Sequence, residues 1–391
     1  MALELNKLTS SVDALGASTA ERLTKLEAAL PTAQATLNAI AADPTKLEAQ
    51  IAKAIKLRWI GALPTREPVN AVYPQPEPPS RYNFIAADGS QIYPDRHGLA
   101  LYYLINVGSI IFQMGTGGAP VCNSQPQLFF DEQDLYYDGE NFPITRERVD
   151  ALRDVYEAGE LARLVSGEAA TAPTAAIIDG TLRLASNARE QNRAFIEEAR
   201  TQYINHLSDI RASKAALAGV IDRSASNVVI RLLNLATLEP EAITQQEIDA
   251  TDLFPGALDI DLFGKLKFGE RSALFTTPAA EKDLYVAEGH RVYFFYLNAG
   301  QPPHDPPLRV EVPEWVVNNN QVDLVHTAIV EQSRHTSGYP YALTRAHELA
   351  VVTVQEHRAF DEMLVATLVR RGVAPTVSQK ARGKAMLGKR R

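Results

Sequence analysis

Two aspartate–glycine pairs follow apolar runs at separate places in the chain. Asp88 ends the apolar part of FIAADGSQIYP (Phe84–Pro94), and Asp179 ends that of AAIIDGTL (Ala175–Leu182). Aspartate and glycine are common turn residues, so a turn explains either pair alone. A carboxylate at the tip of a buried strand is poorly placed for packing. Because the same pattern occurs twice, a chemical role for the two carboxylates is favoured over a turn. We therefore interpret Asp88 and Asp179 as paired acids on neighbouring strands.

The elements around these acids predict the order β-β-β-α-β-α-β. After the Asp88 strand, Gly98–Met114 indicates an antiparallel hairpin that turns near Asn106–Gly108, and residues 115–143 read as an irregular insertion. Helical periodicity over Ile144–Val165 precedes the Asp179 strand. A strand that follows such a helix lies parallel to the first strand through a right-handed crossover. Asp88 and Asp179 are then neighbours in space.

The helix over residues 144–165 passes the same edge of the sheet and offers a third acid. Glu157 lies near the margin of its apolar stripe, and Glu160 is three residues further on and shares that face. The spacing favours Glu157 as the third acid and does not exclude Glu160. Three gathered carboxylates stay ionised only beside cations, and oxygen ligands favour Mg²⁺ or Mn²⁺ over Zn²⁺. Two such ions roughly 4 Å apart perform the chemistry of metal nucleases.

Three further residues are candidates for chemistry. His347 lies in GYPYALTRAHELAVV, a turn that runs into a buried helix. It is either a structural histidine or a phosphate contact and proton carrier. Asp222 and Glu311, in or at the end of strands, are weaker candidates.

Basic residues are concentrated in two places that suit phosphate groups. Lys265, Lys267 and Arg271 lie in LFGKLKFGERSALF, and the tail from Ser378 holds six basic residues and no acid. Arg345, two residues before His347, is a further candidate for DNA contact. Ordinary surface chemistry explains the first group equally well, and a basic terminus is often a solubilising or docking end.

Composition limits the class of protein. The 391 residues are 46% hydrophobic with a net charge of -8, so the chain is globular and any nucleic-acid surface must be local. The single Cys122 excludes an internal disulfide and a cysteine zinc site. No signal sequence, apolar run long enough for a membrane span, P-loop, dinucleotide fingerprint or Gly-x-Ser-x-Gly motif occurs. We expect a cytoplasmic protein without a membrane segment.

Proline and leucine patterns divide the chain. Residues 1–62 predict an N-terminal helical hairpin, and residues 63–80 form a linker with six prolines between Leu63 and Pro79. Residues 81–377 then form the main domain, and 378–391 form the basic tail.

Several motifs, taken in order, resemble the NurA nuclease family: IAADGSQIYP, IIDGTL, GVIDRSASNVVIRLL, GERSALF, RVEVPEW and GYPYALTRAHELAVV. The resemblance runs from about residue 80 to about residue 380. It implies an α/β fold with an RNase H-like mixed sheet flanked by helices. It also implies a Mn²⁺-dependent nuclease (Mg²⁺ being the other ion) that acts on DNA ends, a homodimer, and a partner ATPase, the hexameric DNA translocase of the HerA type.

The resemblance extends to single residues. Asp88, Asp179 and His347 match the family's two acids and its histidine, and Glu157 is the best match for the helix glutamate. Asp222 stands where the family pattern has serine, so we give that turn no catalytic role. Two other functions use the same fold: a non-catalytic DNA-binding or ATPase-docking module, and a nuclease that processes RNA.

Overall fold

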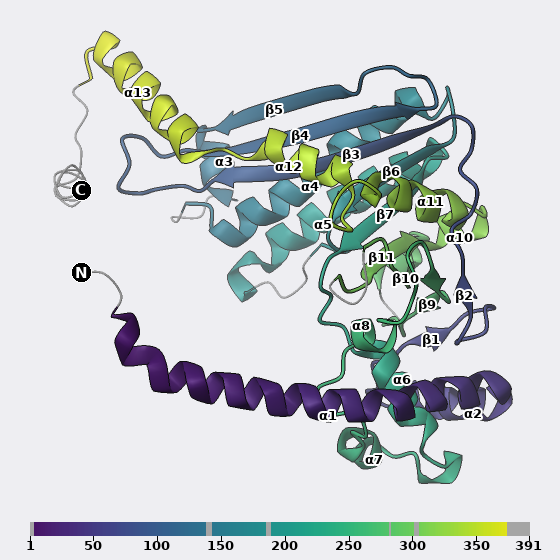
Figure 1. The fold of residues 1–391 in the computed structure, drawn as a ribbon. Coiled ribbons are helices and arrows are strands. Elements are labelled where there is room, and N and C mark those ends of the chain that lie inside the picture. Colours follow the sequence, from purple (N-terminus) through teal and green to yellow (C-terminus); the bar gives the residue numbers. More distant parts are fainter. Residues whose placement is uncertain (1–3, 138–142, 185–188, 281–282, 301–304, 374–391) are drawn as a thin grey trace. The chain divides into compact units, whose positions relative to one another are not determined.

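The computed structural model describes residues 4–137, 143–184, 189–280, 283–300 and 305–373 (Figure 1). The predicted basic tail, 378–391, lies outside the described residues. The chain divides into two units, each built from two separate segments. Unit 1 comprises Met1–Pro78 and Gly219–Pro340, and unit 2 comprises Pro79–Ala218 and Tyr341–Arg391.

Unit 2 is built around the strand that carries Asp88. β3 (Tyr82–Ile92) pairs antiparallel with β4 (Tyr103–Met114), which pairs antiparallel with β5 (Val121–Phe129). On its other side β3 pairs in parallel with β6 (Thr174–Asp179), and β7 (Ala216–Ile221), of which only Ala216–Ala218 belong to unit 2, follows. The strands lie in the order β7-β6-β3-β4-β5, with helices between β5 and β6 and between β6 and β7. The mixed sheet and the parallel pairing of β3 with β6 are as predicted, but the second and third strands are not the predicted ones.

The predicted hairpin turn near Asn106–Gly108 is wrong. Those residues lie within the single long strand β4, and the chain reverses after Met114 instead. Gly108 is needed inside the strand, because a Cβ there would lie 2.4 Å from the carbonyl oxygen of Ala346. The third strand, β5, occupies the stretch read as irregular. Its residues are mostly exposed on both faces, so they show no apolar alternation, and Pro126 is tolerated because β5 is an edge strand.

Helices cover both faces of the unit 2 sheet. α4 (Arg146–Glu168) and α5 (Arg193–Ala212) pack against each other, and α4 packs on β3. α12 (Tyr341–Ala350) lies across β3 and β4 on the opposite face (Figure 1). α4 begins where the Thr145 hydroxyl accepts the backbone N–H of Arg148, a side-chain N-cap. The remaining helices are α3 (Glu132–Leu135), the 3₁₀ turn Glu190–Asn192 and α13 (Val354–Arg370).

Unit 1 holds short strands and many helices. Its strands run β1-β9-β10-β11-β7, with β2 paired to β8 and β8 to β10. Their bounds are β1 (Leu63–Pro64), β2 (Val72–Tyr73), β8 (Arg271–Ser272), β9 (Phe275–Thr276), β10 (Val292–Leu297) and β11 (Leu308–Pro313). Its helices are α1 (Thr9–Ala42), α2 (Pro44–Ala54), α6 (Val228–Ala236), α7 (Gln245–Ala250), α8 (Asp259–Leu262), α9 (Leu284–Ala287), α10 (Glu314–Asn318) and α11 (Val322–Ser333), with 3₁₀ turns at Leu5–Leu8 and Pro240–Ala242.

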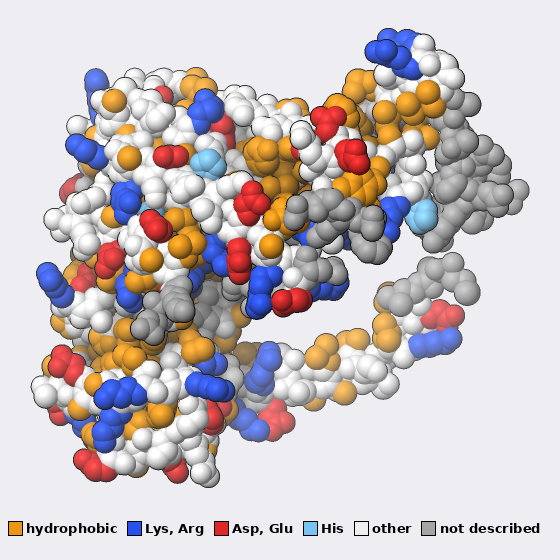
Figure 2. All heavy atoms as spheres, turned by 180° about the vertical axis from the view of Figure 1, so that it is seen from behind, with side chains coloured by type: hydrophobic (Ala, Val, Ile, Leu, Met, Phe, Trp, Pro, Cys, Tyr) orange, Lys and Arg blue, Asp and Glu red, His pale blue; other side chains and the backbone are white. Residues whose placement is uncertain are grey.

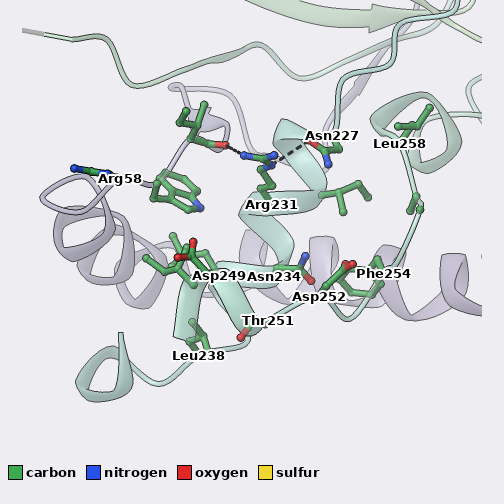
Figure 3. A pocket seen from close by; sticks show the side chains of 17 residues that line it. Arg58, Asn227, Arg231, Asn234, Leu238, Asp249, Thr251, Asp252, Phe254 and Leu258 are labelled. Carbon is green, nitrogen blue, oxygen red and sulfur yellow. Dashed lines mark hydrogen bonds between the residues drawn. The ribbon is translucent and has the colours of Figure 1, made fainter. Parts of the chain in front are cut away.

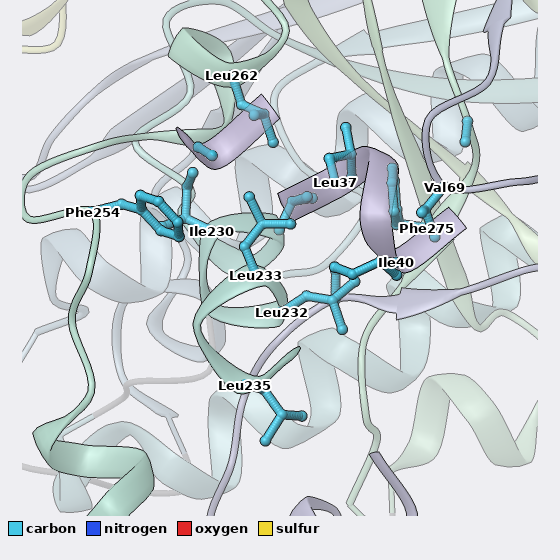
Figure 4. Packing of buried hydrophobic residues seen from close by; sticks show 14 of the residues in the cluster. Leu37, Ile40, Val69, Ile230, Leu232, Leu233, Leu235, Phe254, Leu262 and Phe275 are labelled. Carbon is cyan, nitrogen blue, oxygen red and sulfur yellow. The ribbon is translucent and has the colours of Figure 1, made fainter. Parts of the chain in front are cut away.

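The N-terminal helices contribute to the core of unit 1. α1 continues through Pro31, and its buried Leu37 and Ile40 join a hydrophobic cluster with Leu232 and Leu233 of α6 (Figure 4). α2 begins at Pro44, where the Asp43 carboxylate accepts the backbone N–H of Lys46. Among the described helices, none combines the length and the apolar character that crossing a lipid bilayer requires.

Candidate active site

Asp88 lies on β3 at the point where burial gives way to partial exposure. Its backbone pairs with Gly108 of β4, and its Oδ1 accepts the N–H of Gly89 at 2.9 Å. Its Oδ2 lies 2.6 Å from Nδ1 of His347, which α12 supplies. The Asp88 side chain is 14% exposed and that of His347 is 64% exposed. The fold therefore brings the first predicted acid and the predicted histidine into direct contact.

Asp179 is the last residue of β6, which runs parallel to β3. Ala87 and Ile178 are register partners, so Asp88 and Asp179 occupy the next position on two adjacent strands. The side chain is exposed, and Gly180 follows with a φ of +104°, a conformation that favours glycine. The two predicted acids are thus neighbours where the pairing of β3 with β6 ends, although β3 continues to Ile92, so Asp88 is not at the tip of its strand as predicted.

Glu157 approaches the same edge from α4. It is 8% exposed, and Nε of Arg153 lies 3.3 Å from its Oε1. Gly89 makes this approach possible, because a Cβ at residue 89 would lie 2.7 Å from Oε1 of Glu157. Neighbouring residues of a strand face opposite sides. Asp88 therefore faces α12, while on the α4 side the Glu157 side chain lies against the backbone of Gly89.

The acids influence one another electrostatically. Burial raises the pKa of Glu157 well above its ordinary value, and the charge of Asp154 raises it further. Arg153 lowers it, and Asp88 and Asp179 both raise it. Asp88, Glu157 and Asp179 therefore share one local field, and each would gain from a cation placed among them.

Asp154, one turn before Glu157, belongs to the same acidic neighbourhood. Its pKa is raised by burial, against the lowering effect of Arg153, and by the charges of Asp150 and Asp88. Sequence reasoning missed both Asp154 and Arg153. Their spacing from Glu157 was the available signal, but Arg–Glu pairs at i and i+4 are common on solvated helix faces.

Glu160, the other predicted helix acid, faces a different neighbour. Its carboxylate accepts the Ser109 hydroxyl at 2.8 Å and two guanidinium N–H groups of Arg163 at 2.8 and 2.9 Å. Ser109 belongs to β4 and pairs with Ala87. The structure therefore engages Glu160 with Ser109 and Arg163, while Glu157 lies against the backbone directly after Asp88.

The donor chemistry of this site fits a hard divalent cation, since the three candidate ligands are carboxylates. Two of the carboxylates now have other partners, Asp88 with His347 and Glu157 with Arg153. Within the described part of the chain, no three histidine, cysteine or acidic side chains converge closely enough to hold a metal ion. Coordination would require these side chains to change partners.

The basic residues predicted to contact phosphate differ in their exposure and in their partners. Lys265 and Lys267 are exposed in unit 1, and Arg345 on α12 pairs with Glu348. Arg271 is a correction to the sequence prediction, because it is 4% exposed and binds Glu67 through Nη2 at 2.9 Å. Its guanidinium also lies 4.1 Å from the ring centroid of Tyr73, so it is a buried structural cation rather than a surface contact.

The weaker candidates lie in unit 1 or at its boundary strand. Asp222 is exposed directly after β7, and Glu311 on β11 is buried against Arg309 at 3.0 Å. On the face shown in Figure 2, basic side chains are scattered among acidic and apolar ones.

A cavity of about 350 Å³ lies in unit 1 beside α6 (Figure 3). Arg231 at its wall donates to the Asn227 side chain at 3.1 Å and to the Ile60 carbonyl at 3.4 Å. Its lining, as far as the chain is described, includes none of the predicted site residues.

Comparisons with known proteins place the chain in a family. No curated protein matches its sequence. The solved structures similar to it include the NurA nuclease from Sulfolobus solfataricus, with 13% identity, 85% of this chain and 94% of that chain covered, and a TM-score of 0.49. They also include the catalytic domain of human Endonuclease V, with 13% identity, 72% and 83% covered, and a TM-score of 0.32.

The family model decides the assignment. The NurA domain model matches residues 82–352, which include Asp88, Glu157, Asp179 and His347 and exclude α1 and α2. This match spans more than half of the chain and begins at the first residue of β3. The chain therefore belongs to the NurA family.

Proposed function

We propose that this protein is a metal-dependent nuclease that hydrolyses phosphodiester bonds at DNA ends. The observation that carries the proposal is the placement of three acids around one stretch of β3: Asp88 and Asp179 at adjacent positions on parallel strands, and Glu157 against the backbone of Gly89. Membership of the NurA family supports it independently.

In this proposal the three carboxylates would hold Mn²⁺ or Mg²⁺, and we expect two ions. Such ions, when bound, activate water and stabilise the leaving oxygen of a phosphodiester. Asp88 and Asp179 hold them from adjacent strands, and Glu157 completes the set from α4. The His347 ring is open to solvent and anchored on Asp88, so it can contact a phosphate or carry a proton at the edge of the site.

Cleavage of end-labelled DNA in Mn²⁺ tests this function. Asp88→Asn or Asp179→Asn should lower the rate at least about 100-fold, because each removes a metal ligand. Asp131→Asn is the matched control: Asp131 is exposed, follows the end of β5, and its side chain makes no cap hydrogen bond. It should retain the parent rate.

The same assay separates the other functions. If matched RNA strands are cleaved faster than DNA, the substrate is RNA, and the assignment of the site residues stands. A parent protein that binds DNA but cleaves neither nucleic acid with Mn²⁺ would instead be a non-catalytic module, and the proposal would be wrong.

We further propose that the protein acts as a homodimer with a HerA-type hexameric ATPase in the resection of double-strand breaks. The net charge of -8 and the pairing of Arg271 and Arg345 with acids support the need for a partner that retains DNA. Light scattering should give twice the chain mass. Adding the ATPase should raise the rate and DNA retention, and an unchanged rate and retention would count against the partnership.

A further inference from the structure

Arg153 of α4 lies between two acids of the candidate site. Its Nη2 is 2.7 Å from Oδ1 of Asp154, and its Nε is 3.3 Å from Oε1 of Glu157. The guanidinium therefore neutralises Glu157 while it is held more closely by Asp154. The side chain is 29% exposed, so it belongs to the wall of the site rather than to open surface.

The backbone of β3 defines where Arg153 lies. A Cβ on Gly89 would be 2.7 Å from Cγ of Arg153 and 2.7 Å from Oε1 of Glu157. Both side chains therefore cross the same bare stretch of strand, directly after Asp88. A cation that entered among Asp88, Asp179 and Glu157 would meet the Arg153 charge there.

A second layer of residues holds Arg153 from the other side. Its Nη1 donates to the Gln91 side-chain carbonyl at 3.4 Å, and the Gln91 amide donates to Asp150 at 3.2 Å. The Tyr93 hydroxyl also donates to Asp150, at 2.6 Å. Arg153 can thus leave Glu157 without losing its other partners, Asp154 and Gln91.

We propose that Arg153 is a positioning residue, the internal counter-cation of Glu157 in the metal-free protein, which gives up Glu157 and keeps Asp154 when a divalent cation binds. This inference rests on the proposed function, since it assumes that Glu157 is a metal ligand. It implies that Arg153 lowers the affinity of the site for the divalent cation. The guanidinium must first leave Glu157, and its positive charge then repels the bound cation from nearby.

Mn²⁺ binding to the full chain, measured by the electron paramagnetic resonance of free Mn²⁺, tests the inference. Arg153→Met keeps the aliphatic stem and removes the charge, and it should lower the Kd for Mn²⁺ on the order of tenfold. Damage to the fold would weaken binding, so tighter binding is a readout that a purely structural role does not produce. Arg153→Lys keeps a charge and should stay near the parent Kd.

Arg163→Met is the matched control. Arg163 also forms an arginine–glutamate pair on α4, with Glu160, whose carboxylate accepts the Ser109 hydroxyl rather than approaching Gly89. It should leave the Kd unchanged. Thermal unfolding in EDTA should show a lower Tm for Arg153→Met than for the parent, together with a larger rise in Tm on adding Mn²⁺.

The outcomes separate this inference from the proposed function. If the parent binds Mn²⁺ through Asp88 but Arg153→Met binds it equally or more weakly, the inference about Arg153 is wrong and the metal site stands. If the parent binds no Mn²⁺, or binds it equally after Asp88→Asn and Asp179→Asn, the proposed function fails first.

Discussion

At the scale of single residues, Gly89 links the first strand to the candidate site. Glycine at a strand end reads as a turn residue, yet Gly89 lies within β3 and pairs with Val107. Its missing side chain admits Glu157 and Arg153 to the backbone beside Asp88. The residue is therefore part of the site, because it defines how closely the α4 acid can approach the β3 acid.

Substitution of Gly89 should impair the site more than the fold. In Gly89→Ala the added Cβ would overlap side-chain atoms of Glu157 and Arg153, which can move away. We expect Tm to fall by a few degrees and the Mn²⁺-dependent cleavage rate to fall at least about tenfold. Gly167→Ala on α4 is the control, since nothing lies within 4 Å of its added Cβ. Equal rates for both variants and the parent would contradict this role.

The raised pKa of Glu157 has a consequence for stability. The folded chain holds the Glu157 proton more tightly than the unfolded chain, whose pKa is near 4.5. The free energy of unfolding of the metal-free protein should therefore decrease as pH rises from about 4.5 through the raised folded pKa. One such group contributes a slope of at most about 1.4 kcal/mol per pH unit.

Glu157→Gln should reduce that slope and stabilise the metal-free protein at neutral pH, by on the order of 1 kcal/mol. Urea unfolding in EDTA at several pH values measures it. Parallel curves for the parent and Glu157→Gln would show that burial of this carboxylate does not control the pH response.

At the scale of elements, α12 delivers His347 to Asp88 by lying directly on β4. The sequence predicts this helix, but it divides β4 into two strands, and the close approach of the helix and strand backbones at Gly108 is visible only in three dimensions. The same contact explains the misplaced turn, since a glycine in an apolar run suggests a bend. β5 was missed because an exposed edge strand has no buried face to impose alternation.

Gly108 should be intolerant of a side chain. A Cβ there would lie 2.4 Å from the Ala346 carbonyl oxygen and 2.5 Å from the Ala350 nitrogen, both backbone atoms. Gly108→Ala should therefore displace α12, lower the free energy of unfolding by about 2 kcal/mol and separate His347 from Asp88. Urea unfolding and the cleavage rate measure these effects.

Gly16→Ala on α1 is the control. A Cβ at residue 16 would meet nothing within 4 Å, so this substitution should not lower the free energy of unfolding. Parent-like behaviour of Gly108→Ala would refute the packing argument.

At the scale of the whole molecule, the sequence predicted the family, the mixed sheet and the adjacent parallel strands that carry Asp88 and Asp179. These follow from local signals: apolar runs, helical periodicity and acids at strand ends. The division into units was not visible, because each unit joins segments more than a hundred residues apart. The surroundings of Arg271 were not visible either, because its ion pair with Glu67 joins segments about 200 residues apart and leaves no periodic pattern.

The central claim is that Asp88, Asp179 and Glu157 together bind divalent metal. Crystals soaked in Mn²⁺ and measured by anomalous diffraction test it directly. We predict Mn²⁺ peaks within coordination distance of all three carboxylates, with Arg153 turned toward Asp154 and Glu160 still bound to Ser109 and Arg163. Peaks elsewhere, or none at these residues in crystals that bind Mn²⁺ at other sites, would contradict the account.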